Sequence, residues 1–78
     1  MTSATILYEG TKQFAEFAAM NAATEQHEQT TGHKHIWRSY WAHECRECGW
    51  NVTLSIVRGD PFNPNSAPAT MRVTEWLS

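Results

Sequence analysis

The stretch that decides the fold is Cys45-Arg46-Glu47-Cys48-Gly49-Trp50-Asn51-Val52-Thr53-Leu54-Ser55-Ile56-Val57. In residues 50–57, apolar and polar side chains alternate with a period of two and β-branched residues are frequent, which predicts a β-strand. The aromatic segment 36–43, just before the cysteines, predicts a second strand. With the short turn between them, these strands predict an antiparallel hairpin that carries the cysteine pair at its tip.

The two cysteines, Cys45 and Cys48, are the only thiols of the chain. A disulfide between them would close a very small loop and would therefore restrain little of the unfolded chain. A redox dithiol is favoured where a helix begins at the motif, because a helix N-terminus lowers the thiol pKa, whereas a strand is predicted to follow here. We interpret the thiols as metal ligands; the alternatives are a redox dithiol and two thiols without a role.

Three of the four histidines lie close to the cysteines in sequence, at His33, His35 and His43. Thiolate sulfur and imidazole nitrogen suit Zn²⁺, which takes four ligands in a tetrahedron at structural sites. Two cysteines separated by two residues can bind one ion from a single turn. Gly49 directly after them supplies the unusual backbone angles that let amide groups point at the sulfurs.

This pattern resembles that of small zinc-ribbon, or zinc-knuckle, proteins, many of them encoded by bacteriophages and bacteria. Their Cys-x-His-x-Trp and Cys-x-x-Cys-Gly motifs correspond here to His33-Lys34-His35-Ile36-Trp37 and Cys45-Arg46-Glu47-Cys48-Gly49, with His33 in place of a cysteine. The resemblance implies a structural Zn²⁺ held by His33, His35, Cys45 and Cys48. It also implies a binding or accessory module, and a phage or mobile-element accessory protein would fit the size and charge of the chain.

The distance between the two half-sites leaves the ligand set open. A straight strand rises about 3.3 Å per residue, so the steps from His35 to Cys45 would span roughly 33 Å. A site with both motifs therefore requires a chain reversal near residues 38–40, where no Gly, Pro, Asn or Asp marks one. If the strand runs straight, His43 becomes the better third ligand, and His27 is a further alternative.

A helix is predicted upstream, from Thr11 as its N-cap to about Glu28, with Gly32 as its stop signal. Its alanine-rich middle favours helix. Phe14 and Phe17 are expected on its buried face.

Shorter elements complete the predicted domain. Residues 5–8 and 71–77 predict strands, and segment 58–70, which holds all three prolines, predicts a long loop. We therefore expect one small α+β domain, residues 1–78, in which a helix packs on a small antiparallel sheet with a zinc knuckle at a hairpin tip.

Composition excludes several classes of protein. With 6 Lys+Arg against 8 Asp+Glu among 78 residues, the chain lacks the basic footprint that is typical of nucleic-acid binding. The N-terminus shows no leader pattern, and no run approaches the ~20 apolar residues of a membrane span, so we expect a cytoplasmic protein that does not bind membranes. The motifs of zinc deaminases and zinc proteases are absent, so we expect no enzymatic activity.

Four tryptophans in so short a chain predict a binding surface. Trp37 and Trp41 are expected on one face of the same strand with Phe62 at the rim, where they would bind another protein or a second copy of the chain. The alternative is a nucleic-acid-binding zinc ribbon. In that case Lys34, Arg38 and Arg46 would contact phosphates while the two tryptophans stack on bases.

Overall fold

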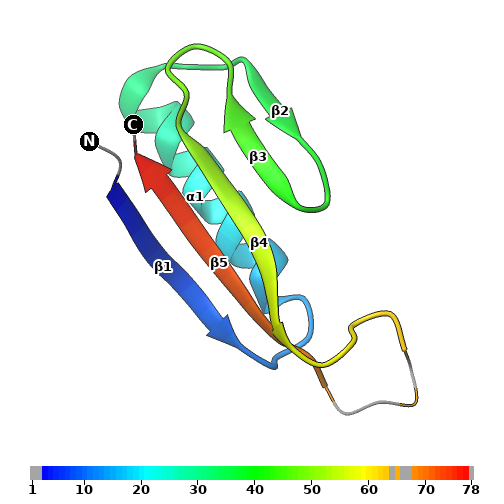
Figure 1. Ribbon diagram of the computed structural model, residues 1–78. Helices are drawn as coiled ribbons and strands as arrows, with labels where there is room; N and C mark the ends of the chain where they lie inside the picture. The colour runs from blue at the N-terminus through cyan, green and yellow to red at the C-terminus, as the bar shows by residue number, and fades with distance from the viewer. Residues whose placement is uncertain (1–2, 64, 66–67, 78) are drawn as a thin grey trace.

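A helix lies along one face of a five-stranded antiparallel sheet in the computed structural model, which describes residues 3–63, 65 and 68–77 (Figure 1). In chain order the elements are β1 (Ser3–Gly10), α1 (Ala15–Thr31), β2 (Ile36–Arg38), β3 (Ala42–Cys45), β4 (Asn51–Arg58) and β5 (Thr70–Leu77). The strands lie in the order β1-β5-β4-β3-β2. The α+β class and the packing of one helix on the sheet are thus confirmed.

The hairpin predicted around the cysteines is present, because β3 pairs with β4 and places His43 opposite Val52. Alternation along β4 sends Val52 and Leu54 toward the helix, where both are buried. The neighbouring strand β5 adds Met71 and Val73 to the same layer. These four side chains, with Met20 from α1, form most of the core beneath the helix.

Segment 36–43 was expected to be one strand, and this expectation is wrong. The chain reverses between β2 and β3, so the two short strands pair with each other, with Trp37 opposite Glu44. Ser39 closes the turn: its backbone N–H donates to the carbonyl of Ala42 at 2.8 Å, and its hydroxyl accepts the Ala42 N–H at 3.2 Å. A serine that bonds the backbone provides the turn here without glycine or proline.

The helix begins later than predicted, at Ala15, and ends at Thr31. Gly32 is confirmed as its stop: its φ is 76°, and its N–H donates to the carbonyl of Glu28 at 3.0 Å.

The expectation that Phe14 belongs to the core is wrong, because Phe14 precedes the helix in a left-handed conformation and is 63% exposed. The buried stripe of α1 contains instead Glu16, Met20 and Thr24, spaced by four residues.

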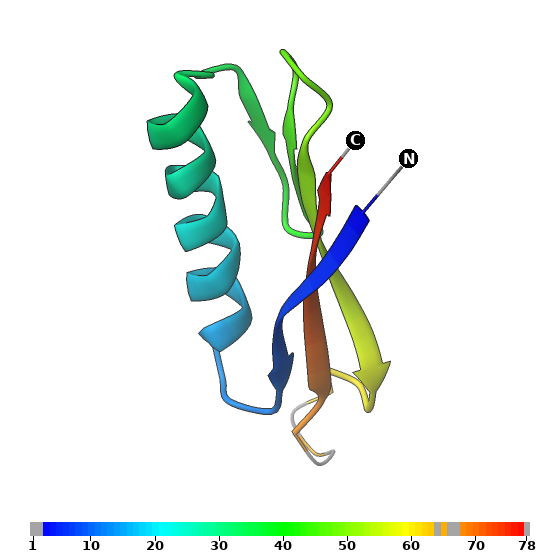
Figure 2. The ribbon, with the colours of Figure 1, turned by 90° about the vertical axis from the view of Figure 1, so that its left-hand side faces the viewer.

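The proline-bearing segment lies between β4 and β5, and its described residues form neither helix nor strand. Residues 64, 66 and 67 of this predicted loop lie outside the described residues. In the described part of the chain, no helix covers the sheet face opposite α1 (Figure 2). Nor does that part contain a helix of the length and apolarity needed to cross a membrane.

Candidate metal centre

Two histidines and two cysteines meet where the end of α1 approaches the tip of the β3–β4 hairpin. His27 lies in the last part of α1, His33 just after Gly32, Cys45 at the end of β3 and Cys48 in the following turn. One donor atom from each side chain lies within 4.8 Å of every other. The four side chains therefore lie close enough together to hold a metal ion.

Two of the donor separations are close to those between ligands of a tetrahedral metal ion. Cys45 Sγ lies 3.6 Å from His33 Nδ1, and Cys48 Sγ lies 3.5 Å from His27 Nε2. Tetrahedral zinc with Zn–S of about 2.3 Å and Zn–N of about 2.0–2.1 Å requires sulfur–nitrogen separations of about 3.6 Å. The other donor pairs, within 4.8 Å, would have to draw together around an ion.

Backbone hydrogen bonds shape the turn that presents the two sulfurs. The Cys45 N–H donates to the Trp50 carbonyl at 2.7 Å, and the Gly49 N–H donates to the Cys45 carbonyl at 3.1 Å. Gly49 has a φ of 82°, a left-handed conformation that glycine adopts without steric cost. The turn expected at Gly49 is therefore present.

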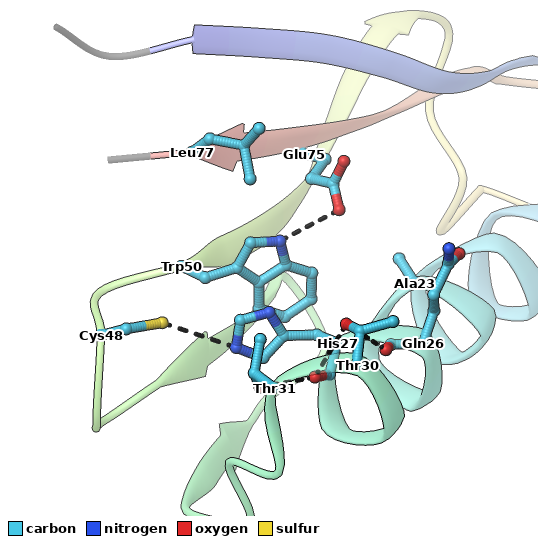
Figure 3. Close-up of a pocket in the computed structure, with 9 residues that line it drawn as sticks. All are labelled: Ala23, Gln26, His27, Thr30, Thr31, Cys48, Trp50, Glu75 and Leu77. Carbon is cyan, nitrogen blue, oxygen red and sulfur yellow. Dashed lines mark hydrogen bonds between the residues drawn. The ribbon is translucent and has the colours of Figure 1, made fainter.

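A chain of contacts across the core holds the His27 ring in place. Its imidazole stacks on the Trp50 indole with ring centroids 4.3 Å apart and planes inclined by 10° (Figure 3). The indole N–H of Trp50, a buried residue, donates to Glu75 Oε2 at 3.0 Å. Partners outside the ligand group commonly orient metal ligands in this way.

The surroundings of His27 favour its neutral form. Burial, and next the neighbouring His33, hold the pKa of His27 below its ordinary value, although Glu75 and other carboxylates oppose the shift. A neutral imidazole is the form that binds a metal.

The Cys48 thiol is subject to opposing influences. The backbone N–H of Trp50 lowers its pKa, whereas burial and the adjacent Cys45 raise it, and the net shift is upward. With no cation at the site, Cys48 is thus the thiol, and metal binding has to displace its proton.

Glu47, between the two cysteines, ties the turn to the segment that carries His33. Its Oε2 accepts the backbone N–H groups of Lys34 at 2.8 Å and of His35 at 3.4 Å. Desolvation raises the pKa of Glu47, but these hydrogen bonds and the nearby His33 outweigh it and hold the pKa below its ordinary value. The Arg46 N–H donates in turn to the His35 carbonyl at 2.8 Å.

The structure brings together three of the four expected ligands: His33, Cys45 and Cys48. The fourth member of the group is His27, whereas His35 is exposed and contacts the turn through its backbone. The helical position of His27 was the available signal. It follows Thr24 by three residues and Met20 by seven, so it continues their buried stripe.

His43, the alternative ligand for a straight strand, points instead into the core. It is 7% exposed, and its Nδ1 lies 2.7 Å from the hydroxyl oxygen of Thr24. That hydroxyl donates to the Met20 carbonyl at 3.0 Å, which leaves the His43 Nδ1–H to donate to Thr24. His43 therefore links β3 to α1.

The expected partner-binding aromatics lie in two places. Trp41 and Phe62 contact each other with ring centroids 6.1 Å apart, and Tyr40 packs against both. Trp37 lies on β2, where the guanidinium carbon of Arg46 is 5.7 Å from its ring centroid. Phe14 and Phe17 extend the first group, and we call these rings the aromatic cluster: Phe14, Phe17, Tyr40, Trp41 and Phe62.

Comparisons with protein-family models, with curated proteins and with solved structures gave no significant match. The fold and the site define a small α+β domain with a candidate Cys₂His₂ metal centre.

Proposed function

We propose that the chain is a non-enzymatic, zinc-stabilised binding module that acts by contact with another protein. The observation that carries the proposal is the group of His27, His33, Cys45 and Cys48, whose donor atoms lie within 4.8 Å of one another. Domains of this size bury few residues and commonly need a staple. The binding energy of structural zinc is folding energy, and here it would tether the helix to the hairpin.

The donor set supports zinc in a structural role. Two thiolates with two imidazoles are a ligand combination that zinc prefers in tetrahedral sites. A catalytic zinc keeps one position open for water, whereas four protein donors would complete this tetrahedron. The same argument supports the absence of catalysis.

Elemental analysis of the purified, untagged protein tests the zinc proposal. We expect one zinc per chain, and loss of that zinc in the Cys45→Ser variant. His35→Ala is the matched control, because it removes an imidazole next to the site but outside the ligand group. A wild-type protein without metal, whose melting is also unchanged by a chelator, would contradict the proposal.

The aromatic cluster supports protein contact. Tyr40 is 42% exposed, Trp41 41% and Phe62 64%. Exposed aromatic side chains are enriched at binding hot spots, and a contiguous exposed apolar patch is typical of an interface. Sedimentation of the wild type and a Trp41→Ala variant tests whether the partner is a second copy of the chain.

The nucleic-acid alternative has weaker support. Arg38 forms an ion pair with Glu28 at 3.1 Å and Arg46 lies over Trp37, so two of the three proposed phosphate ligands have partners within the chain. Binding that weakens steeply with salt would favour nucleic acid.

The resemblance to zinc-ribbon proteins, with the small size, is the basis for an accessory role in a phage or mobile element. Neither cysteine forms a disulfide, which fits the reducing cytoplasm, and for a phage protein this is the host cytoplasm.

A further inference from the structure

A pocket lies at the start of α1, at the end of the helix away from the candidate metal centre. Its volume is about 410 Å³, within the ~300–1,000 Å³ range of small-ligand sites. Three segments enclose it: the chain leading into α1, the β2–β3 turn at Tyr40, and the proline-bearing segment with Asp60, Pro61 and Pro68. None of the four candidate metal ligands lines this pocket.

Glu16 is an unusual residue in its lining. The side chain belongs to the buried stripe of α1, and the residue is only 8% exposed. Among the described residues, the ion pairs are Arg38–Glu28 and Arg72–Glu9, and no hydrogen bond reaches the Glu16 carboxylate. A largely buried carboxylate without a partner in the chain is stabilised only by whatever contact its oxygens keep with water or a ligand.

The Glu16 oxygens are also not sealed off. No fully buried side-chain oxygen or nitrogen of the described residues lacks a hydrogen-bond partner. Since the Glu16 oxygens have none, they must reach solvent, and Glu16 lines this pocket. Glu16 thus contributes a carboxylate that solvent can reach to the lining of this pocket.

Aromatic rings form the wall next to this charge. Phe17 packs edge-on against Tyr40 with ring centroids 5.1 Å apart, and Phe14 lies 6.2 Å from Phe17. All three residues line the pocket. Aromatic faces attract cations within about 6 Å of the ring centroid, so the carboxylate and the rings favour the same kind of ligand.

We propose that this pocket binds a basic side chain of the partner protein, with the cationic group on the Glu16 carboxylate and the alkyl stem against Phe17 and Tyr40. Arginine fits best, because its planar guanidinium pairs with a carboxylate in bidentate fashion and stacks on aromatic rings. This inference rests on the proposed function, since it identifies the group that a partner presents beside the exposed part of the aromatic cluster.

The probe is Nα-acetyl-arginine amide, titrated into the ¹⁵N-labelled, zinc-loaded protein and followed by NMR. The neutral isostere Nα-acetyl-citrulline amide is the comparison, and the lysine derivative tests the second basic side chain. We expect saturable shifts at Glu16, Phe17, Tyr40 and Ala69 with arginine, weaker shifts with lysine, and none with citrulline. Equal shifts with arginine and citrulline would overturn the proposal.

Glu16→Gln removes the charge and keeps the shape of the side chain. We expect arginine binding to weaken by roughly tenfold, as for loss of a charge-assisted hydrogen bond. Glu25→Gln is the matched control, because Glu25 is an exposed residue of the same helix and its loss should leave binding unchanged. If Glu16 acted only on the helix dipole, Glu16→Gln would lower the melting temperature without changing arginine affinity, which overturns the proposal.

Lys12 is the competitor within the chain, since it also lines the pocket and precedes Glu16 by four residues. Arginine binding that appears only in a Lys12→Met variant would show that the chain fills its own pocket, and would overturn the inference. Failure of these titrations with zinc content and melting intact would leave the zinc-stabilised module in place. Loss of zinc and fold in the wild type would instead remove the proposed function itself.

Discussion

His27 Nε2 lies 3.5 Å from Cys48 Sγ, although 21 residues separate them in sequence. The contact joins the end of α1 to the tip of the β3–β4 hairpin, next to the stack of His27 on Trp50. An ion bound there would fix the helix on the sheet.

The ligand set can be tested with single histidine variants. We expect His27→Ala and His33→Ala to lose zinc, because each removes one of four donors. His35→Ala and His43→Ala should retain it, because their rings lie outside the group. Zinc stoichiometry of the four variants is the measurement. Retention of zinc by His27→Ala together with its loss from His35→Ala would favour the ligand set implied by the zinc-ribbon resemblance.

Metal removal should unfold the domain. Structural zinc contributes several kcal/mol, and each lost kcal/mol lowers the melting temperature of a domain this small by about 4–8 °C. We therefore expect a chelator, or the Cys48→Ser substitution, to lower the melting temperature by about 20 °C or more. Calorimetry with and without chelator measures this. Restoration of the transition by added Zn²⁺, but not by Mg²⁺, is the control for an effect of the metal site.

The strands were predictable because their signal is local. Alternation in residues 50–57 determines which side chains face the helix, and β4 shows that pattern. The reversal at Ser39 was not predictable in this way, because the turn is held by a side-chain hydroxyl and lacks the usual turn residues. From the sequence, a reversal near residues 38–40 was expected only if the histidine motif at 33–37 and the cysteine motif at 45–49 contribute to one metal site.

The candidate ligands were predictable only where their sequence signal is local. Cys45 and Cys48 form a local motif, whereas the approach of His27 depends on how α1 packs on the sheet. The buried stripe of α1, which contains Met20 and Thr24, leads to His27. The sequence interpretation chose another stripe, because it placed Phe14 and Phe17 on the buried face of the helix. Phe14 precedes the helix, so helical spacing does not apply to it.

His43 should make stability depend on pH. Burial, and next Arg38, lower the pKa of His43 from its ordinary value of 6.5. The unfolded state then binds more protons than the folded state below about pH 6.5, so the free energy of unfolding is greatest above that pH and falls as the pH decreases. Urea denaturation at about pH 7.5 and about pH 5.5 measures the loss. We expect His43→Gln to be less stable than the wild type but to lose less stability between the two pH values; an equal loss would contradict the assignment.

The last prediction concerns Phe14, whose φ of 65° places a bulky residue in the left-handed region. This conformation costs an L-residue roughly 1–2 kcal/mol, whereas glycine adopts it freely. Phe14→Gly and Phe14→Ala remove the same ring from the aromatic cluster. The difference between their free energies of unfolding therefore measures the cost of the left-handed backbone conformation. We expect Phe14→Gly to be more stable than Phe14→Ala by roughly 1 kcal/mol in urea denaturation of the zinc-loaded protein.

A glycine substitution at Ala22, an exposed position within α1, provides the control of opposite sign. There Ala22→Gly should destabilise the protein by about 1 kcal/mol, because glycine is a poor helix former. The reversal of sign between positions 14 and 22 is the result that identifies the left-handed backbone. If alanine is the more stable of the two substitutions at position 14, the residue has a negative φ, and α1 then begins earlier, as the capping signal at Thr11 predicts.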